Sequence, residues 1–357
     1  MLSESRYLSL KHWLATVLSP KDGCSSIQLS SMTGDAGFRQ YYRFHHDGVS
    51  FIAVDAPPSL SNNDAFVALQ QSLASQNICV PQIIACDLTQ GFFCLSDFGD
   101  YLLADLVKSE KESALVKSFY MKAINMLPSI AKARILPTND YKLPIYDRAF
   151  IQLELSIFTD WLLSKHLNIK LTANDQRQLE SCFSLLVDSA LDQPQVTMHR
   201  DYHSRNIMIL EDKQLGVIDF QDAVTGPITY DIVSLLRDCY VRYSDEMVTS
   251  LFTSFCRLME TQYSLTSVSD EQWNKWFDFM GLQRHLKASG IFCRLYYRDN
   301  KEGYLKDVPL TLSYIENISS RYPALRFIHQ LITEKVQPAM NKLHEQPSCH
   351  DDKPIKK

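Results

Sequence analysis

The first hundred residues combine one helical pattern of apolar positions with several short apolar runs of strand length. Apolar residues at helical spacing predict an amphipathic helix over residues 4–18. A second helix is expected through about residue 75, with Ser61 or Asn63 as its cap. Three further runs are too short for helices and predict strands. These strands are expected at residues 51–56, 80–85 and 91–95.

Beyond residue 102 the apolar positions follow the 3.6-residue helical period almost throughout. Helices are expected at residues 102–107, 114–133, 148–166 and 172–191. Strands followed by helices predict an α+β fold, with a small antiparallel β lobe before a mainly helical lobe. The expected parts are a small lobe at 1–96, a hinge at 97–104, a helical lobe at 105–345 and a disordered tail at 346–357.

Composition narrows the possible functions without naming one. The chain has 357 residues and a net charge of −5, which argues against nucleic-acid binding. No apolar segment approaches the length of a membrane span, and no secretory signal pattern opens the chain. Nine cysteines without metal-binding spacing indicate reduced thiols in a cytoplasmic protein. Nothing in the sequence implies a stable protein partner, so a monomer is expected.

Three oxygen-bearing side chains stand at fixed spacing around two short apolar runs. Asp201 follows His199-Arg200, Asn206 comes five residues later, and Asp219 follows the second run. The expected order of loop, strand, turn and strand would bring all three to one place. Each of these residue types also caps turns, but that explanation does not account for their joint order and spacing.

Phosphoryl transfer from ATP requires such a group of oxygens. The pattern H-R-D-x-x-x-x-N with a later D-F is that of the catalytic loop and metal segment of kinase-like enzymes. In this interpretation Asp201 holds the acceptor hydroxyl and takes its proton. Asn206 and Asp219 would hold Mg²⁺ against the phosphates. His203 or Arg205 would steady the loop or the transferring group.

The phosphates also need a glycine turn and a cation, and here the sequence departs from the kinase pattern. Gly34 and Gly37 can form a turn that covers the phosphates, although an ordinary hairpin explains them too. The strand at 51–56 carries no lysine, whereas kinases place one on their third strand. Arg39 and Arg43 are the nearest substitutes, unless both are solvated hairpin arginines.

The letters Asp97-Phe98-Gly99 spell the D-F-G motif but precede the catalytic loop instead of following it. They come after the last predicted strand, where a hinge between lobes belongs. Backbone groups of Leu95, Asp97 and Phe98 are therefore expected to bind the adenine of ATP.

The motif Asp201-x-His203-x-x-Asn206 resembles the aminoglycoside phosphotransferase and choline kinase superfamily. Two other stretches, FQDAVTGPITYDIVSLLRDCY and GLQRHLKASGIFCRL, resemble a subgroup of bacterial sugar kinases. That subgroup phosphorylates the anomeric hydroxyl of N-acetylmuramate and N-acetylglucosamine. The resemblance covers about residues 25–320 and implies a two-lobed, protein-kinase-like fold.

The resemblance also implies roles for further residues. Asp231 would brace the catalytic loop, and ATP and Mg²⁺ would be the cofactors. Asp222, Arg284, Lys287 and Arg294 would contact the sugar, since an arginine can clamp the carboxylate of a muramic acid. For the cations, a charged helix face with salt bridges is the ordinary alternative.

Two other functions stay open from the sequence. One is a kinase for another small molecule, such as an aminoglycoside or choline, although a polycation does not suit the cationic stretch at 281–298. The other is a pseudokinase that binds nucleotide without turnover, which the absent strand lysine supports. The sequence does not decide between ATP and GTP.

Overall fold

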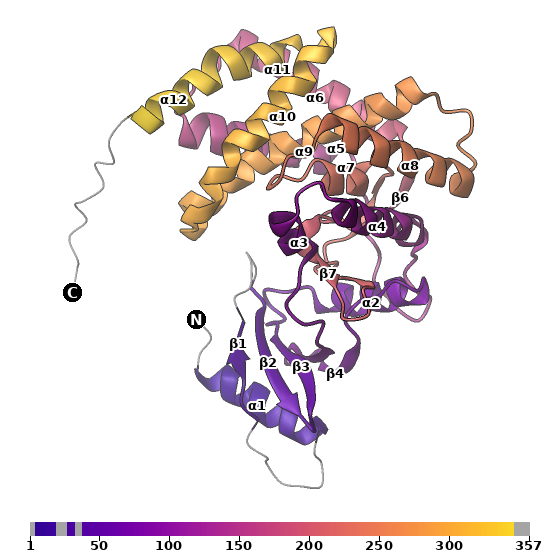
Figure 1. Cartoon of the computed structure of the whole chain (residues 1–357). Coiled ribbons are helices and arrows are strands. Elements are labelled where there is room, and N and C mark those ends of the chain that lie inside the picture. The colour runs from indigo at the N-terminus through magenta and orange to yellow at the C-terminus, as the bar shows by residue number, and fades with distance from the viewer. Residues whose placement is uncertain (1–3, 19–26, 33–37, 346–357) are drawn as a thin grey trace, which may run out of the picture. The chain divides into compact units, whose positions relative to one another are not determined.

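The computed structural model describes residues 4–18, 27–32 and 38–345 (Figure 1). The expected glycine turn at Gly34 and Gly37 and the expected tail from residue 346 lie outside the described residues. The chain divides into two compact units. The first unit comprises Met1–Ile145, Val196–Leu236 and Tyr243–Thr266. The second comprises Tyr146–Gln195, Arg237–Arg242 and Ser267–Lys357. These units are defined by contacts between residues and do not correspond to the two predicted lobes. The lobe boundaries expected from the sequence therefore stay a prediction.

A five-stranded antiparallel sheet lies in the first unit (Figure 1). Its strand order is β1-β2-β3-β5-β4. The strands are β1 (Ser30–Ser31), β2 (Gln40–His46), β3 (Val49–Asp55), β4 (Ile83–Asp87) and β5 (Phe92–Ser96). Residues alternate between the two faces along each strand, so the sheet has two different apolar surfaces to cover.

Helix α1 (Glu4–Leu18) covers one face of this sheet. Leu10 and Leu14 pack in one buried cluster with Tyr42 and Phe44 of β2. The guanidinium of Arg6 is hydrogen-bonded to the buried carboxylate of Asp55 at the end of β3. The helix expected at residues 4–18 is therefore present, and a buried ion pair fixes it to the sheet.

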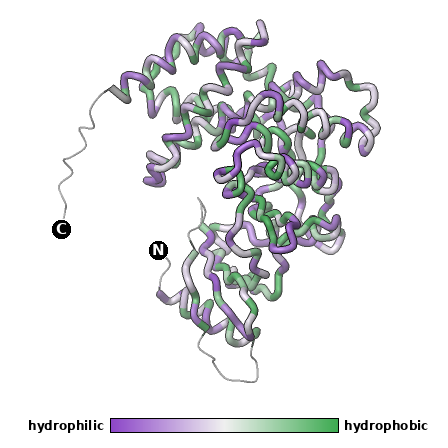
Figure 2. Tube along the Cα trace, viewed as in Figure 1, coloured by the Kyte–Doolittle hydropathy of each residue, from purple (hydrophilic) through white to green (hydrophobic). Residues whose placement is uncertain are grey.

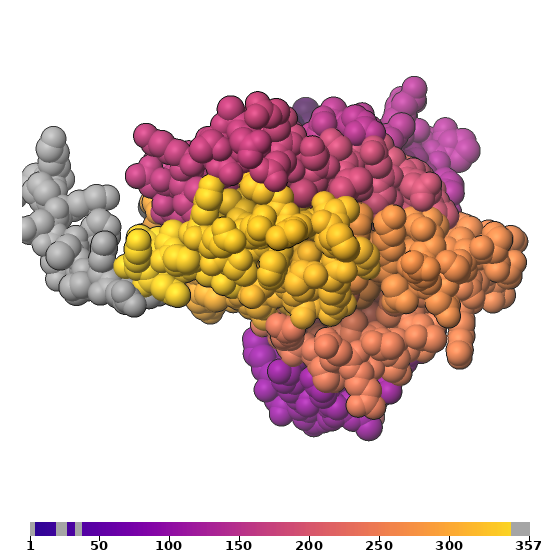
Figure 3. All heavy atoms as spheres, turned by 90° about the horizontal axis from the view of Figure 1, so that it is seen from above, coloured from indigo at the N-terminus to yellow at the C-terminus, as the bar shows by residue number. Residues whose placement is uncertain are grey.

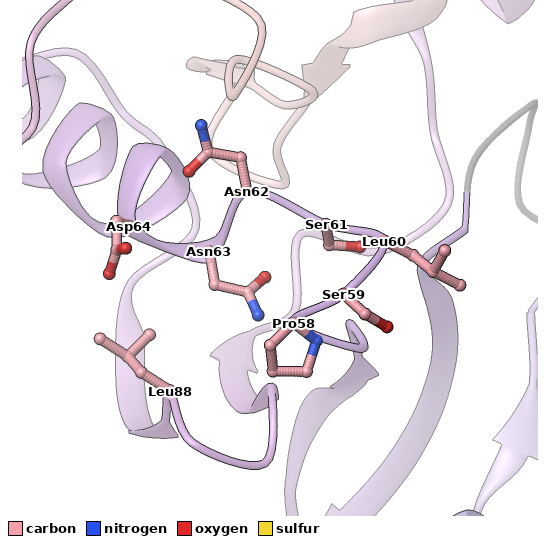
Figure 4. Close-up of a pocket in the computed structure, with 8 residues that line it drawn as sticks. All are labelled: Pro58, Ser59, Leu60, Ser61, Asn62, Asn63, Asp64 and Leu88. Carbon is pink, nitrogen blue, oxygen red and sulfur yellow. The ribbon is translucent and has the colours of Figure 1, made fainter.

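Helix α2 (Asn63–Ser75) covers the other face, where Phe66 meets Phe93 of β5 edge to face at 5.3 Å. Its cap is Asn62, whose side-chain oxygen accepts a hydrogen bond from the Ala65 N–H at 3.0 Å. The expected caps, Ser61 and Asn63, are wrong by one residue. The side chain of Asn63 instead turns back and donates to the Ala56 carbonyl at 2.8 Å. Residues 58–64 and Leu88 line an open surface hollow beside this turn (Figure 4).

Gly91, at the turn before β5, combines a positive φ of 75° with a close backbone approach. A Cβ atom there would lie 2.0 Å from the Ala56 carbonyl oxygen. We expect Gly91→Ala to lower the free energy of unfolding by more than about 2 kcal/mol, because backbone strain and steric overlap add. Denaturant titration measures the change.

Gly48→Ala is the matched control for this prediction, because Gly48 has a φ of 78° and open space around its missing side chain. It carries the backbone cost alone, about 1–2 kcal/mol. Equal losses in the two variants would show that the approach to Ala56 is unimportant.

The remainder of the first unit combines helices with two small pairs of strands. β7 (Ile207–Ile209) and β8 (Leu215–Val217) form an antiparallel hairpin, and β6 (Gln195–Met198) pairs with β9 (Val224–Pro227). The hairpin lies where the sequence predicts it. The helices are α3 (Leu103–Ser109), α4 (Ala114–Lys132), η2 (Ser204–Asn206), α7 (Tyr230–Leu236) and α8 (Asp245–Tyr263).

The second unit is helical in its described part, and hydrophobic and hydrophilic positions alternate along its helices (Figure 2). The 30-residue helix α9 (Asp270–Asp299) contacts five other segments of this unit. These are α5 (Arg148–Ile157), η1 (Phe158–His166), α6 (Ala173–Asp192), η3 (Glu302–Asp307) and α10 (Val308–Arg321). The rest are η4 (Pro323–Leu325), α11 (Arg326–Gln330), η5 (Leu331–Val336) and α12 (Gln337–Glu345). Figure 3 shows these C-terminal helices, in yellow, beside α6.

The single helix expected at residues 148–166 changes character within its length. It is α-helical to Ile157 and continues as the π-helix η1. Gly290 of α9 packs against this junction, and a Cβ atom at Gly290 would lie 2.2 Å from the Ile157 carbonyl oxygen. The apolar period in the sequence predicts the helix but not its wider turns.

The antiparallel sheet and the helical majority confirm the predicted α+β class. Among the described residues, no helix combines the length and apolar character that crossing a membrane requires.

Candidate active site

The turn after β6 carries the first catalytic candidate and is held in a strained conformation. Arg200 has a positive φ of 73°, which costs energy for a residue with a side chain. The carboxylate of Asp231, at the start of α7, accepts hydrogen bonds from the N–H groups of His199 (2.7 Å) and Arg200 (3.0 Å). These two bonds satisfy the backbone of the turn and set the direction in which Asp201 leaves it.

Two buried side chains fix the turn further. The Nε2 atom of His199 lies 3.0 Å from the Ile218 carbonyl oxygen, and burial lowers the pKa of this histidine. A neutral His199 donates this hydrogen bond. The hydroxyl of Tyr202 is fully buried and donates to the Ala123 carbonyl of α4 at 2.9 Å. The turn that carries Asp201 is thus tied to Ile218, the residue before Asp219, and to a neighbouring helix.

The structure brings Asp201, Asn206 and Asp219 together. The amide nitrogen of Asn206 lies 3.0 Å from the Asp201 carbonyl oxygen and 3.4 Å from a carboxylate oxygen of Asp219. The Ile218 N–H donates to the Asn206 carbonyl at 3.1 Å, so the β7–β8 hairpin returns the chain to its starting point. Asp219 has a φ of 63°, and its other carboxylate oxygen accepts a hydrogen bond from Gln221 at 2.7 Å.

The surroundings of Asp219 make its carboxylate harder to ionise. Desolvation by the surrounding chain raises the pKa of Asp219, and the charges of Asp201 and Asp222 raise it further. The side chain of Asp219 nevertheless stays exposed to solvent on one side. Mg²⁺ prefers oxygen ligands, and this site offers the exposed carboxylate of Asp219 with the amide group of Asn206 beside it. The residues present therefore fit a magnesium ion.

Three other predicted residues lie on the same segment of the first unit. His203 directly precedes the short helix η2, and Arg205 lies within it. Both are half-buried. The charge of His203 partly offsets the effect of the carboxylates on Asp219. Asp222 is exposed, and its carbonyl oxygen accepts a hydrogen bond from Arg200 at 3.3 Å.

The segment after β5 is rigidly held, which suits the hinge predicted there. The Asp97 carboxylate accepts hydrogen bonds from Arg43 and Ser50 at 2.6 Å each. Burial opposes ionisation of Asp97, but these donors prevail and lower its pKa. The ring of Phe98 packs against Gly216 of β8, and buried Leu95 lies within β5.

The two arginines proposed as phosphate ligands have different surroundings. Arg43 is engaged by Asp97 and Asp100, with a second contact of 2.7 Å to Asp100. Arg39 lies over the ring of Phe66 at 5.2 Å and donates to the Asn62 carbonyl at 3.1 Å. Phe66 in turn stacks on Phe220, the residue after Asp219, at 5.1 Å. Through Phe66, Arg39 is therefore linked to Phe220 next to Asp219, whereas Arg43 is held by the segment after β5.

The three cations predicted to contact substrate all lie on α9 of the second unit, and the structure does not bring them together. Arg284 is buried, with Nη1 3.6 Å from the Cys239 sulfur. Lys287 forms an ion pair of 2.7 Å with the buried carboxylate of Glu154. Arg294 is half-buried, and its Nε atom has no hydrogen-bond partner among the described residues.

Sequence reasoning missed Tyr41 of β2 and Gln221 at this site. Burial raises the pKa of Tyr41, the neighbouring Arg39 lowers it, and the carboxylates of Asp219 and Asp222 raise it. The alternation along β2 is the signal that could have found it, because Tyr41 shares a face with Arg39 and Arg43.

Comparisons with known proteins agree with this geometry. The model of the "Phosphotransferase enzyme family" matches residues 29–263. A Neisseria meningitidis protein named N-acetylmuramate/N-acetylglucosamine kinase is 34% identical, over 93% of this chain and 96% of that protein. A Pseudomonas putida protein of the same name is 37% identical, over 86% and 88%.

Solved structures with low sequence identity share the fold. An ethanolamine kinase from Plasmodium vivax has a TM-score of 0.62 at 12% identity, covering 92% of each chain. The aminoglycoside phosphotransferase APH(4)-Ia has a TM-score of 0.55 at 13% identity, covering 89% of this chain and 98% of the other. These likenesses confirm the predicted protein-kinase-like fold.

Proposed function

Because the chain belongs to the phosphotransferase enzyme family, we propose that it is a kinase for N-acetylated amino sugars. It transfers the γ-phosphoryl group of ATP to the anomeric hydroxyl of N-acetylmuramate and N-acetylglucosamine. The relatives' names support the choice of sugars. The observation that carries the chemistry is the meeting of Asp201, Asn206 and Asp219.

In this mechanism Asp201 orients the sugar hydroxyl and accepts its proton as the sugar oxygen bonds to the γ-phosphorus. The bond from that phosphorus to the β,γ-bridging oxygen breaks in the same transfer, and ADP leaves. Asn206 and Asp219 would hold Mg²⁺, which would supply neutralising charge to the phosphate oxygens. Asp231 keeps the strained turn at Arg200 in place, so that Asp201 needs no reorganisation. His203 and Arg205 steady the loop or the transferring group.

On the nucleotide side, Arg39 supplies the cation that β3 lacks, and Gly34 and Gly37 cover the phosphates. Arg43 is the weaker candidate for a phosphate contact, because Asp97 and Asp100 already engage it. The backbone from Leu95 to Phe98 binds adenine.

Asp222, Arg284, Lys287 and Arg294 are proposed sugar contacts. Arg294 is the cation to test first, because its Nε atom has no partner among the described residues, whereas Lys287 is paired with Glu154. A carboxylate is present on N-acetylmuramate and absent from N-acetylglucosamine, so a cation that binds it discriminates between these two sugars.

We therefore expect Arg294→Gln to raise the KM for N-acetylmuramate about tenfold or more and to leave that for N-acetylglucosamine within twofold. Steady-state kinetics with both sugars measures this. Arg298→Gln is the control, because Arg298 lies on the same helix and is paired with the neighbouring Asp299. Equal changes in KM for both sugars would contradict the proposal that Arg294 binds the carboxylate.

An assay of ADP release from Mg-ATP tests the function as a whole. It compares five conditions, which are N-acetylmuramate, N-acetylglucosamine, kanamycin, choline and no acceptor. Turnover confined to the two acetylated sugars is the expected result. Turnover on kanamycin or choline instead would support a kinase of the same family with a different substrate. ATP binding without consumption on any acceptor would favour a pseudokinase, which the absence of a lysine on β3 supports.

The product, a sugar 1-phosphate, suits a later nucleotidyl transfer in the recycling of cell-wall sugars. We propose a cytoplasmic location, because the reaction consumes ATP. We also propose a monomer without a stable protein partner.

A further inference from the structure

The strand β2 presents two chemically different faces. Tyr42 and Phe44 enter the buried cluster beneath α1. Because side chains alternate along a strand, Tyr41 and Arg43 point to the opposite face, and Arg39 precedes them at the same spacing. This second face is the one that α2 covers, since Phe66 of α2 meets Phe93 of β5 there.

The two ends of this face have known neighbours. At one end, Arg43 is hydrogen-bonded to Asp97 in the hinge. At the other end, Arg39 lies over Phe66, which stacks on Phe220 beside Asp219. Tyr41 lies between these ends on β2, and the charges of Arg39, Asp219 and Asp222 all act on its phenol.

The register of the sheet shows what stands opposite Tyr41. Its partner on β3 is Val54, which is buried, and Val54 is also paired with Phe93 on β5. Opposite Tyr41 this face is therefore apolar on β3 and β5, so the polar groups nearest to it come from β2. Tyr41 is a neutral donor at physiological pH, and Arg39 is a permanent cation.

We propose that Tyr41, oriented by Arg39, donates its phenolic hydrogen to a terminal oxygen of the bound nucleotide triphosphate. The ligand group is the β,γ-phosphate part of ATP, so the inference rests on the proposed kinase function. Arg39 accounts for the charge that a strand lysine would carry, and Tyr41 for the directional hydrogen bond.

The test is nucleotide binding by calorimetry, with no sugar present and no turnover. Tyr41→Phe is expected to weaken the binding of Mg-ATP about tenfold, the usual effect of losing a hydrogen bond to a charged group. Binding of AMP, which lacks the β- and γ-phosphates, is expected to stay within twofold. Tyr42→Phe is the matched control, because it removes one hydroxyl from the neighbouring residue on the opposite face.

The coupling between the two residues gives a second readout. If Arg39 orients Tyr41, the double variant Arg39→Gln/Tyr41→Phe loses less affinity for Mg-ATP than the two single losses predict. Additive losses would contradict the orienting role of Arg39.

Equal weakening of ATP and AMP, or no weakening of either, would overturn the inference for Tyr41. Its failure is separable from failure of the proposed function. A wild-type protein that phosphorylates the acetylated sugars and a Tyr41→Phe variant with unchanged ATP affinity would reject the inference alone. Absence of any ATP binding by the wild type would reject both.

Discussion

Asp201→Asn is expected to lower kcat about a thousandfold at saturating ATP and sugar, with the dissociation constant for Mg-ATP changed less than threefold. An amide keeps the size of the side chain and removes its ability to take a proton, and general-base catalysis contributes about 10²- to 10⁴-fold. The hydrogen bond from Asn206 runs to the backbone carbonyl of Asp201, so this substitution leaves it in place. Single-turnover kinetics and calorimetry measure the two quantities.

A control variant separates this effect from a general loss of negative charge. Asp212 is exposed on the turn between β7 and β8, where its carboxylate accepts the Gln214 N–H at 2.9 Å. Asp212→Asn removes one charge from the same hairpin and is expected to keep wild-type turnover. Activity of Asp201→Asn within tenfold of the wild type would contradict its assignment as the base.

The spacing of Asp201, Asn206 and Asp219 could be recognised from the sequence because a short hairpin determines it. Two three-residue strands joined by a tight turn leave few paths for the chain, and the Ile218 N–H closes the path on Asn206. Local residues carry both the pattern and its geometry, so this part of the site needed no knowledge of distant contacts.

The cations illustrate where such reasoning ends. Arg39, just before β2, and Arg43, within it, look alike in the sequence, yet of these two only Arg43 is engaged by Asp97 and Asp100. The partners of Arg43 lie more than fifty positions away along the chain. Spacing along a single strand cannot contain that information.

The same limit applies to α9 and to its contact with α5. Lys287 and Arg284 are a single helical turn apart, which suggests a shared surface. Lys287 is instead paired with Glu154 of α5, and Arg284 approaches Cys239. The apolar period predicts that these helices exist. Tertiary packing decides which polar side chains find a partner within the second unit.

Asp219→Asn is expected to lower kcat on the order of a thousandfold at millimolar Mg²⁺ and to remove the preference for Mg-ATP over free ATP. The variant keeps the backbone conformation, because asparagine tolerates the positive φ of 63° that Asp219 adopts. It removes the negative charge that, with Asn206, makes this site suitable for a divalent cation, a contribution of several kcal/mol to phosphoryl transfer.

Calorimetry with ATP in the presence of Mg²⁺ or of EDTA distinguishes loss of the metal from loss of the nucleotide. The wild type is expected to bind ATP more tightly with Mg²⁺, and Asp219→Asn to bind both forms alike. Glu211→Gln, an exposed carboxylate on the β7–β8 turn, is the control and is expected to keep the wild-type preference. A preference for Mg-ATP that persists in Asp219→Asn would move the metal to other ligands. Asp219 would then act mainly through its contacts with Asn206 and Gln221.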